Sequence, residues 1–180
     1  YEIGVRLVGS EMCIRDSRQI TRQYGKEPLK NRNYGKIINE KHFDRINSLI
    51  DPAKTVCGGG SNRETLQIEP TVLDNVTFED PVMQQEIFGP VLPVLTYDSL
   101  GGAVTKINSM AHPLALYIFT EDEKNAREVT SRCGFGGGCI TMSSYIWQPA
   151  IWASAALVKA VWDPIMASTA SGHSLIIRVL

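Results

Sequence analysis

The chain has 180 residues, of which 43% are hydrophobic and 21% are charged, proportions typical of a folded globular domain. Its formal net charge of -1 gives no basic excess, so we expect neither nucleic acid nor an anionic membrane as a partner. The cysteines form no CxxC pair and have no histidine nearby, which argues against a metal site and favours reduced cytosolic thiols. They lie at positions 13, 57, 133 and 139.

The segment NEKHFDRINSLI predicts the first helix. Phe43, Ile46 and Ile50 recur at the spacing of one helical face, and Asn39 stands where a capping side chain is expected. The next segment, DPAKTVCGGG, predicts a proline-marked turn and a short strand that ends at three glycines. After it, LQIEPTVLDNV alternates between apolar and polar residues and then turns.

The segment GPVLPVLTY predicts an apolar strand, and its two prolines place part of it at a sheet edge or outside regular pairing. A second helix is predicted in SLGGAVTKINSM, with Ser99 as its cap. Its buried face is predicted to contain Ala103, Val104, Ile107 and Met110. LALYIFT then predicts a strand that is covered on both faces, because only Thr120 is clearly polar.

The segment EDEKNAREVTSRC predicts a third helix, which has acidic residues in its first turn and buries Ala126, Val129 and Cys133. GFGGGCI then leads into a further strand. This order of strand, helix, strand, helix and strand is typical of parallel packing with right-handed crossovers. We therefore predict an α/β fold built on a parallel sheet.

The strongest candidates for a binding role lie in PVMQQEIFGP, at the entry to a buried strand. Ligand-contacting groups of open α/β sheets gather at strand ends. A carboxylate at Glu86 can accept hydrogen bonds from two vicinal ribose hydroxyls, and Phe88 can cover a flat heteroaromatic ring. The residues alone leave a second interpretation open, in which Glu86 is a solvated turn residue and Phe88 belongs to the core.

Other candidate residues have simpler interpretations. His42 lies among charged residues and is expected at the surface, while His112, held extended before Pro113, is expected to make a local backbone contact. The glycine runs 58–60 and 136–138 lack the flanking residues of phosphate-binding loops and are predicted to be turns. No cysteine has an identifiable base, so none is predicted to be a nucleophile.

Four segments together resemble the aldehyde dehydrogenase superfamily, and in particular its class 3 and fatty aldehyde branch. They are NYGKIINEKHFDRINSLI, EPTVLDNV, PVMQQEIFGPVLPVLTYDSL and PLALYIFTEDEKN, and they occur in the family's order and spacing. EIFGP is specific on its own. The resemblance covers residues 18–140 and identifies this range as part of a family catalytic domain with a parallel-sheet α/β fold.

The resemblance implies an enzyme that oxidises an aldehyde to a carboxylic acid with NAD or NADP. In the family a cysteine thiolate adds to the carbonyl, hydride leaves to the nicotinamide, and a glutamate-activated water hydrolyses the thioester. The EIFGP glutamate holds the nicotinamide ribose and the phenylalanine contacts the ring, and these roles carry over to Glu86 and Phe88. Cys13 lies too close to Tyr24 to match the family's nucleophile, so no catalytic residue is predicted in this chain.

The segments outside residues 18–140 do not fit the family as written. Residues 1–17 resemble no part of it and are interpreted as foreign or adaptor sequence. At residue 141 the family continues with an Asn-Asp pair and a glycine-rich segment. Translated one base out of frame, with synonymous codons chosen to favour the match, residues 141–180 yield a family-like sequence that includes FGGVGESGMG. We interpret 141–180 as an out-of-frame tail without a reliable fold, with a membrane anchor as the alternative.

Two functions remain open from the sequence. The favoured hypothesis is a fragment of an aldehyde dehydrogenase, itself inactive, whose intact parent acts on a small-molecule aldehyde of unspecified class. The resemblance implies a homodimer or homotetramer for that parent, and we expect it to be cytoplasmic. The alternative is a catalytically inactive, truncated relative that serves as an interaction or membrane-tethered module.

Overall fold

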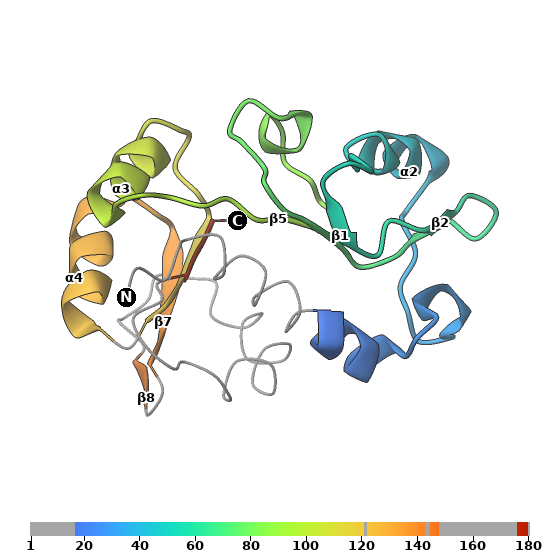
Figure 1. The fold of residues 1–180 in the computed structure, drawn as a ribbon, viewed down its shortest axis with the longest axis horizontal. Coiled ribbons are helices and arrows are strands. Elements are labelled where there is room, and N and C mark those ends of the chain that lie inside the picture. The colour runs from blue at the N-terminus through green and yellow to red at the C-terminus, as the bar shows by residue number, and fades with distance from the viewer. Residues whose placement is uncertain (1–16, 121, 143–144, 148–175, 180) are drawn as a thin grey trace. The chain divides into compact units, whose positions relative to one another are not determined.

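The computed structural model describes residues 17–120, 122–142, 145–147 and 176–179, and Figure 1 shows their helices and strands. The chain forms two compact units that divide between Thr96 and Tyr97. Each unit has its own cluster of buried hydrophobic side chains. The helices and strands of each unit therefore pack around a separate core.

The first unit combines short strands with short helices. Residues 17–24 are helical, and the elements that follow are η1 (Pro28–Lys30), α2 (Glu40–Asn47), β1 (Thr55–Cys57), β2 (Ser61–Asn62), β3 (Gln67–Ile68), β4 (Thr71–Leu73), η2 (Pro81–Met83) and β5 (Val91–Pro93). One sheet has the strand order β1-β4-β5, and β2 pairs with β3 in a second sheet. β1 and β4 run antiparallel, whereas β4 and β5 run parallel.

Helix α2 forms where the sequence predicts it. The predicted cap is confirmed, because Asn39 Oδ1 accepts a hydrogen bond from the backbone N–H of His42 at 2.9 Å. The predicted apolar face is confirmed for Phe43 and Ile46, which are buried. The third predicted residue, Ile50, lies beyond the end of the helix and is only half-buried.

Strand β4 lies at the centre of its sheet and does not alternate as predicted. All three of its residues are 1% exposed, so the side chains on both of its faces are covered. The buried hydroxyl of Thr71 donates to the backbone O of Glu69 at 2.8 Å and accepts from the N–H of Gly59 at 3.0 Å. β5 is an edge strand whose pairing with β4 ends at Pro93, which confirms the prediction from its prolines.

The second unit is a four-stranded sheet with two helices. Its elements are α3 (Leu100–Asn108), β6 (Ala115–Phe119), α4 (Glu123–Arg132), β7 (Gly137–Met142), β8 (Tyr145–Trp147) and β9 (Ile176–Val179). The strand order is β8-β7-β6-β9, in which β6 and β7 run parallel and are connected through α4. Figure 1 shows α3 and α4 on one side of this sheet, and the buried cluster there draws side chains from α3, α4, β6 and β7.

Both helices of the second unit follow their sequence signals. Ser99 Oγ accepts a hydrogen bond from the backbone N–H of Gly102 at 3.1 Å, which confirms the predicted cap of α3. The third predicted helix buries Ala126, Val129 and Cys133, as expected from their spacing. The α/β class with parallel strand pairs is therefore confirmed.

Two details of the predicted sheet are wrong. β6 buries Leu116 and Ile118, but the alternating residues Ala115, Tyr117 and Phe119 are only half-buried, so the strand is not fully covered on both faces. β5 and β6 belong to different sheets, so the series of alternating strands and helices does not extend through a single parallel sheet. The parallel pairing is instead divided between the two units.

The described part of the predicted out-of-frame tail contributes backbone to the four-stranded sheet of the second unit. β8 pairs antiparallel with β7, and β9 pairs antiparallel with β6. Residues 148–175 of this tail, and residues 1–16 of the predicted foreign segment, lie outside the described residues. Among the described residues, no helix combines the length and apolar character needed to cross a membrane.

Candidate functional site

The 84–90 loop, which links η2 to the amino end of β5, contains both residues that the sequence predicts to bind a ligand. Glu86 is exposed, and Phe88 has 82% of its surface exposed. Between them, Ile87 is half-buried and packs against the core cluster of the first unit. The interpretation of Phe88 as a core residue is therefore wrong, whereas the exposure of Glu86 agrees with both interpretations.

Phe88 is held in a backbone conformation that its residue type disfavours. Its φ angle of 49° lies in the left-handed region, which costs a non-glycine residue about 1–2 kcal/mol. Such a conformation persists where the surroundings enforce it, and it is frequent at binding sites. At the next position, a Cβ on Gly89 would lie 2.8 Å from Cδ1 of Ile46, so the loop backbone packs directly on that buried side chain.

Arg45, the neighbour of Ile46 on α2, bonds to the same loop. Its Nη1 donates to the backbone O of Glu86 at 3.1 Å and to Oε1 of Gln85 at 3.1 Å, and its Nη2 donates to the backbone O of Ile87 at 2.8 Å. Hydrogen bonds from a charged donor are stronger than those from a neutral one. Sequence reasoning missed Arg45, because these partners are 40 to 42 positions apart and no local pattern indicates that they meet.

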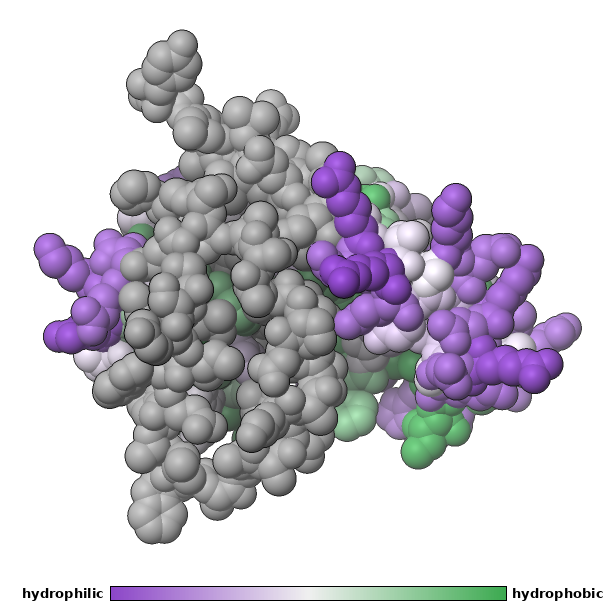
Figure 2. All heavy atoms as spheres, turned by 90° about the horizontal axis from the view of Figure 1, so that it is seen from below, coloured by the Kyte–Doolittle hydropathy of each residue, from purple (hydrophilic) through white to green (hydrophobic). Residues whose placement is uncertain are grey.

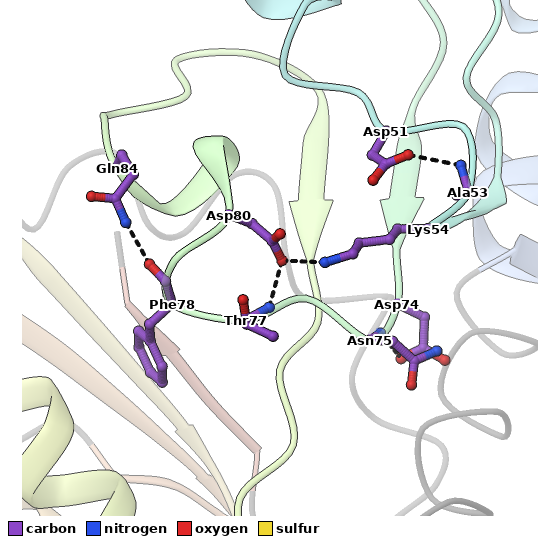
Figure 3. Close-up of polar contacts among 9 residues, drawn as sticks. All are labelled: Asp51, Ala53, Lys54, Asp74, Asn75, Thr77, Phe78, Asp80 and Gln84. Carbon is purple, nitrogen blue, oxygen red and sulfur yellow. Dashed lines mark hydrogen bonds and ion pairs between the residues drawn. The ribbon is translucent and has the colours of Figure 1, made fainter.

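An ion pair holds the segment that precedes the loop, as Figure 3 shows. Lys54 Nζ lies 2.5 Å from Asp80 Oδ2, and this oxygen also accepts a hydrogen bond from the N–H of Thr77 at 2.6 Å. Gln84 Nε2 donates to the backbone O of Phe78 at 2.5 Å and closes the turn. The hydrogen bond from the Lys54 ammonium, supported by that from Thr77, holds the pKa of the Asp80 carboxyl below its usual range.

A hollow of about 230 Å³ adjoins the end of the loop in the first unit. Its lining residues are Tyr34, Gly35, Lys36, Ile37, Ile68 and Pro90. The hydroxyl of Tyr34 donates to the backbone O of Ile68 at 2.6 Å, and burial raises the pKa of Tyr34 above its usual range. The hydroxyl is therefore a protonated, hydrogen-bonded part of the wall.

Large hydrophobic side chains are exposed at a few places among hydrophilic ones. Figure 2 shows one face, on which hydrophilic side chains cover much of the visible described surface and hydrophobic patches lie between them. The exposed large hydrophobic residues of the described part are Ile38, Val56, Phe88 and Leu114. Phe88 is thus one of few aromatic or aliphatic side chains that the described fold leaves open to a ligand.

The remaining sequence candidates do not assemble into a second site. His42 is exposed, as predicted, and the exposed His112 lies against Gly134, where a Cβ would come within 2.8 Å of its Cε1. In the glycine run 58–60, the N–H groups of Gly59 and Gly60 bond to side chains of the protein itself. These donors are therefore already used by the turn and do not form a phosphate cradle.

Among the described cysteines, Cys133 is unlike an activated nucleophile. Cys57, Cys133 and Cys139 are free thiols, and burial raises the pKa of Cys133. A raised pKa lowers the fraction of thiolate, the form that attacks a carbonyl. In the part of the chain that the structure describes, no three or more histidine, cysteine, aspartate or glutamate side chains gather where they could hold a metal ion. Cys13 lies outside the described residues.

Comparison with known proteins identifies one family. A sequence model described as "Aldehyde dehydrogenase family" matches residues 15–147. The chain is 44% identical over 126 residues to 4,4'-diaponeurosporen-aldehyde dehydrogenase of Staphylococcus aureus, with 69% of this chain and 28% of that protein covered. It is 42% identical over 114 residues to "Aldehyde dehydrogenase, dimeric NADP-preferring" of Rattus norvegicus, with 63% of this chain and 25% of that protein covered.

A solved structure agrees with these sequence matches. It is described as the substrate-bound state of Staphylococcus aureus AldH, and it superposes with a TM-score of 0.73 at 40% sequence identity. The superposition covers 75% of this chain and 30% of that chain. The chain therefore spans less than a third of the length of these relatives, whose matched shares are 25% to 30%.

The close approach of the loop to α2 predicts that Gly89→Ala destabilises the 180-residue chain. The added Cβ would press on the buried Ile46 side chain, which should lower the free energy of unfolding by about 1–3 kcal/mol. Urea denaturation measures this change. Gly35→Ala is the matched control, because a Cβ there has no neighbour within 4 Å, and it should change the free energy by less than about 0.5 kcal/mol. Equal stability of the two variants would contradict the contact.

The lowered pKa of Asp80 predicts a pH-dependent contribution to stability. This contribution is fully present above the unfolded-state pKa of about 3.9 and is lost as the pH falls through the lower, folded-state pKa. Asp80→Asn should therefore destabilise the chain at neutral pH, and its difference from the wild type should shrink below about pH 4. Urea denaturation across this range is the measurement. Asp98→Asn, at an exposed position, is the control; a difference for Asp80→Asn that is independent of pH would refute the prediction.

Proposed function

The chain belongs to the aldehyde dehydrogenase family, and we propose that it is part of an enzyme that oxidises an aldehyde to a carboxylic acid with NAD or NADP. The cofactor, when bound, accepts a hydride from the substrate carbon. The name of the rat relative describes that protein as NADP-preferring, which supports this class of cofactor. The proposed substrate is a small-molecule aldehyde.

The single observation that supports this proposal best is the display of Glu86 and Phe88 on the 84–90 loop. A nicotinamide nucleotide offers two vicinal ribose hydroxyls next to a flat ring. The two carboxylate oxygens of Glu86 can each accept a hydrogen bond from one hydroxyl. Within the described residues, Glu86 uses this carboxylate for no hydrogen bond or ion pair of its own, so the residue fits such a role.

Phe88 fits the second half of the same role. The exposed aromatic ring contributes little to the stability of the fold, since its apolar surface stays in water and its backbone is in the left-handed region. A flat ring placed against it would cover that surface and add aromatic contact. We therefore propose that Glu86 binds the nicotinamide ribose and that Phe88 contacts the ring.

In this proposal the chain supplies binding and orientation, and the covalent steps belong to other parts of the protein. There a cysteine thiolate would add to the aldehyde carbonyl, and water would hydrolyse the thioester that remains after hydride loss to the acid and the free thiol. The free thiols Cys57, Cys133 and Cys139 are not assigned as that nucleophile, because the sequence indicates no base for any cysteine. The 180-residue chain by itself is expected to be inactive.

The proposal also covers the cellular location and the oligomeric state of the whole protein. We propose a cytoplasmic location, which the free thiols support because disulfides are rare in reducing compartments. We also propose a homodimer or homotetramer, for which the support is that the rat relative is named as dimeric. Neither nucleic acid nor a membrane is proposed as a partner.

The boundaries of the family segment lead to a prediction about the gene. We propose residues 18–140 as the part that follows the family in frame, with a foreign segment at 1–17 and an out-of-frame tail at 141–180. Sequencing the gene should reveal one extra or missing base near codon 140, because a shifted frame restores the family's glycine-rich segment there. A gene that encodes residues 141–180 as written would contradict the tail proposal.

The proposed role of Glu86 predicts the effect of Glu86→Gln in the full-length enzyme. Loss of the negative charge weakens the hydrogen bonds to the ribose, so cofactor affinity should fall about ten- to hundredfold and hydride transfer should slow. Equilibrium titration and stopped-flow kinetics measure these effects. The matched control is Glu79→Gln, at another exposed glutamate of the same unit, which should change neither quantity. Normal affinity and turnover in Glu86→Gln would refute the assignment.

A further inference from the structure

Arg45 supplies the polar contacts that hold the centre of the 84–90 loop. Its guanidinium reaches the backbone oxygens of Glu86 and Ile87 at 3.1 and 2.8 Å, and the side chain of Gln85 at 3.1 Å. In the described part of the chain, the backbone groups of residues 85–88 form no hydrogen bond with any other backbone group. The contacts of Arg45 therefore replace the ladder or turn bonds that this stretch lacks.

The chemistry of arginine suits two successive carbonyl groups. A guanidinium holds its N–H donors in one plane as a fixed fork, so two nitrogens can bind neighbouring oxygens at the same time. The carbonyls of Glu86 and Ile87 belong to the two peptide planes between Glu86 and Phe88. Fixing both planes sets the directions in which these two side chains leave the backbone. A lysine ammonium has no planar fork and would not fix both planes together.

The same helix adds an apolar hold on the loop. Ile46 follows Arg45 in sequence and contacts Gly89, while Ile87 packs into the cluster that contains Ile46. Helix α2 is itself well supported, since Asn39 caps it and its apolar face is buried. The loop is thus held against α2 by the carbonyls of Glu86 and Ile87, by the Ile87 side chain and by the close approach of Gly89.

We infer that Arg45 is a positioning residue for the cofactor: through the backbone of residues 85–88 it directs Glu86 and Phe88 toward the ribose and the nicotinamide ring. The inference rests on the proposed function of these two residues. Without the guanidinium fork the apolar contacts of Ile46 and Ile87 remain, so the unit stays folded while the loop samples other orientations. Cofactor affinity then falls in proportion to the fraction of molecules whose loop is correctly placed.

The test compares Arg45→Lys and Arg45→Gln in the full-length enzyme. Arg45→Lys keeps the positive charge and the aliphatic stem, so it removes the fork with little risk to folding. Both variants should raise the cofactor Kd about tenfold and speed amide hydrogen exchange at residues 85–89, with the melting temperature and the aldehyde KM unchanged. Lys41→Ala, which removes an exposed cation from the same helix, is the matched control and should alter none of these quantities.

A double-mutant cycle tests whether Arg45 acts through Glu86. In the Glu86→Gln background, Arg45→Lys should weaken cofactor binding by a clearly smaller factor than in the wild type, because the carboxylate that it positions is gone. An equal factor in both backgrounds would mean that Arg45 acts independently of Glu86, and the inference would be overturned. A lowered melting temperature with normal cofactor affinity would show a purely structural role and would overturn it too.

The same measurements separate this inference from the proposed function. If Glu86→Gln binds cofactor weakly while both Arg45 variants bind normally and exchange normally, Arg45 is not a positioning residue and the proposed role of Glu86 stands. If Glu86→Gln also binds cofactor normally, the proposed function of the loop fails, and the inference about Arg45 fails with it.

Discussion

The contact between Gly89 and the buried side chain of Ile46 is the constraint on which the candidate site depends. Ile46 is 0% exposed and closely packed, so a Cβ at position 89 would force its side chain to shift, whereas glycine lets the loop backbone approach it without strain. With the loop held there, Ile87 packs against the core cluster and Phe88 remains outside in a left-handed conformation. The exposure of Phe88 therefore follows from the packing of its neighbours.

Three kinds of interaction hold successive parts of the same segment. The ion pair between Lys54 and Asp80 holds its beginning, the guanidinium of Arg45 holds its centre, and parallel pairing with β4 begins at Val91. The first acts on a carboxylate, the second on two backbone carbonyls, and the third on the backbone of a strand. A loop held in this way loses little further conformational entropy when it binds a ligand, which favours affinity. This is the physical basis for the binding role that we propose for Glu86.

Under the proposed function, cofactor binding and the covalent steps are carried out by different parts of the protein. The described residues contribute a rigid binding loop, and the family match extends over less than a third of the relatives' length. Reacting groups in such an enzyme must be placed accurately relative to the cofactor, so the stiffness of the binding loop matters as much as its residue types. Arg45 has a place in this scheme because it stiffens the loop without contacting the ligand.

The sequence by itself determined the features that depend on near neighbours. Residue types within a few positions predict the caps at Asn39 and Ser99 and the apolar faces of the helices. They also predict the edge position of β5 and the EIFGP segment as candidate site. Only the tertiary structure decided the full burial of β4, the division of β5 and β6 between two sheets, the exposure of Phe88 and the contact of Arg45 with the loop. These features join residues distant in sequence, and their geometry is set by how the core packs rather than by any local pattern.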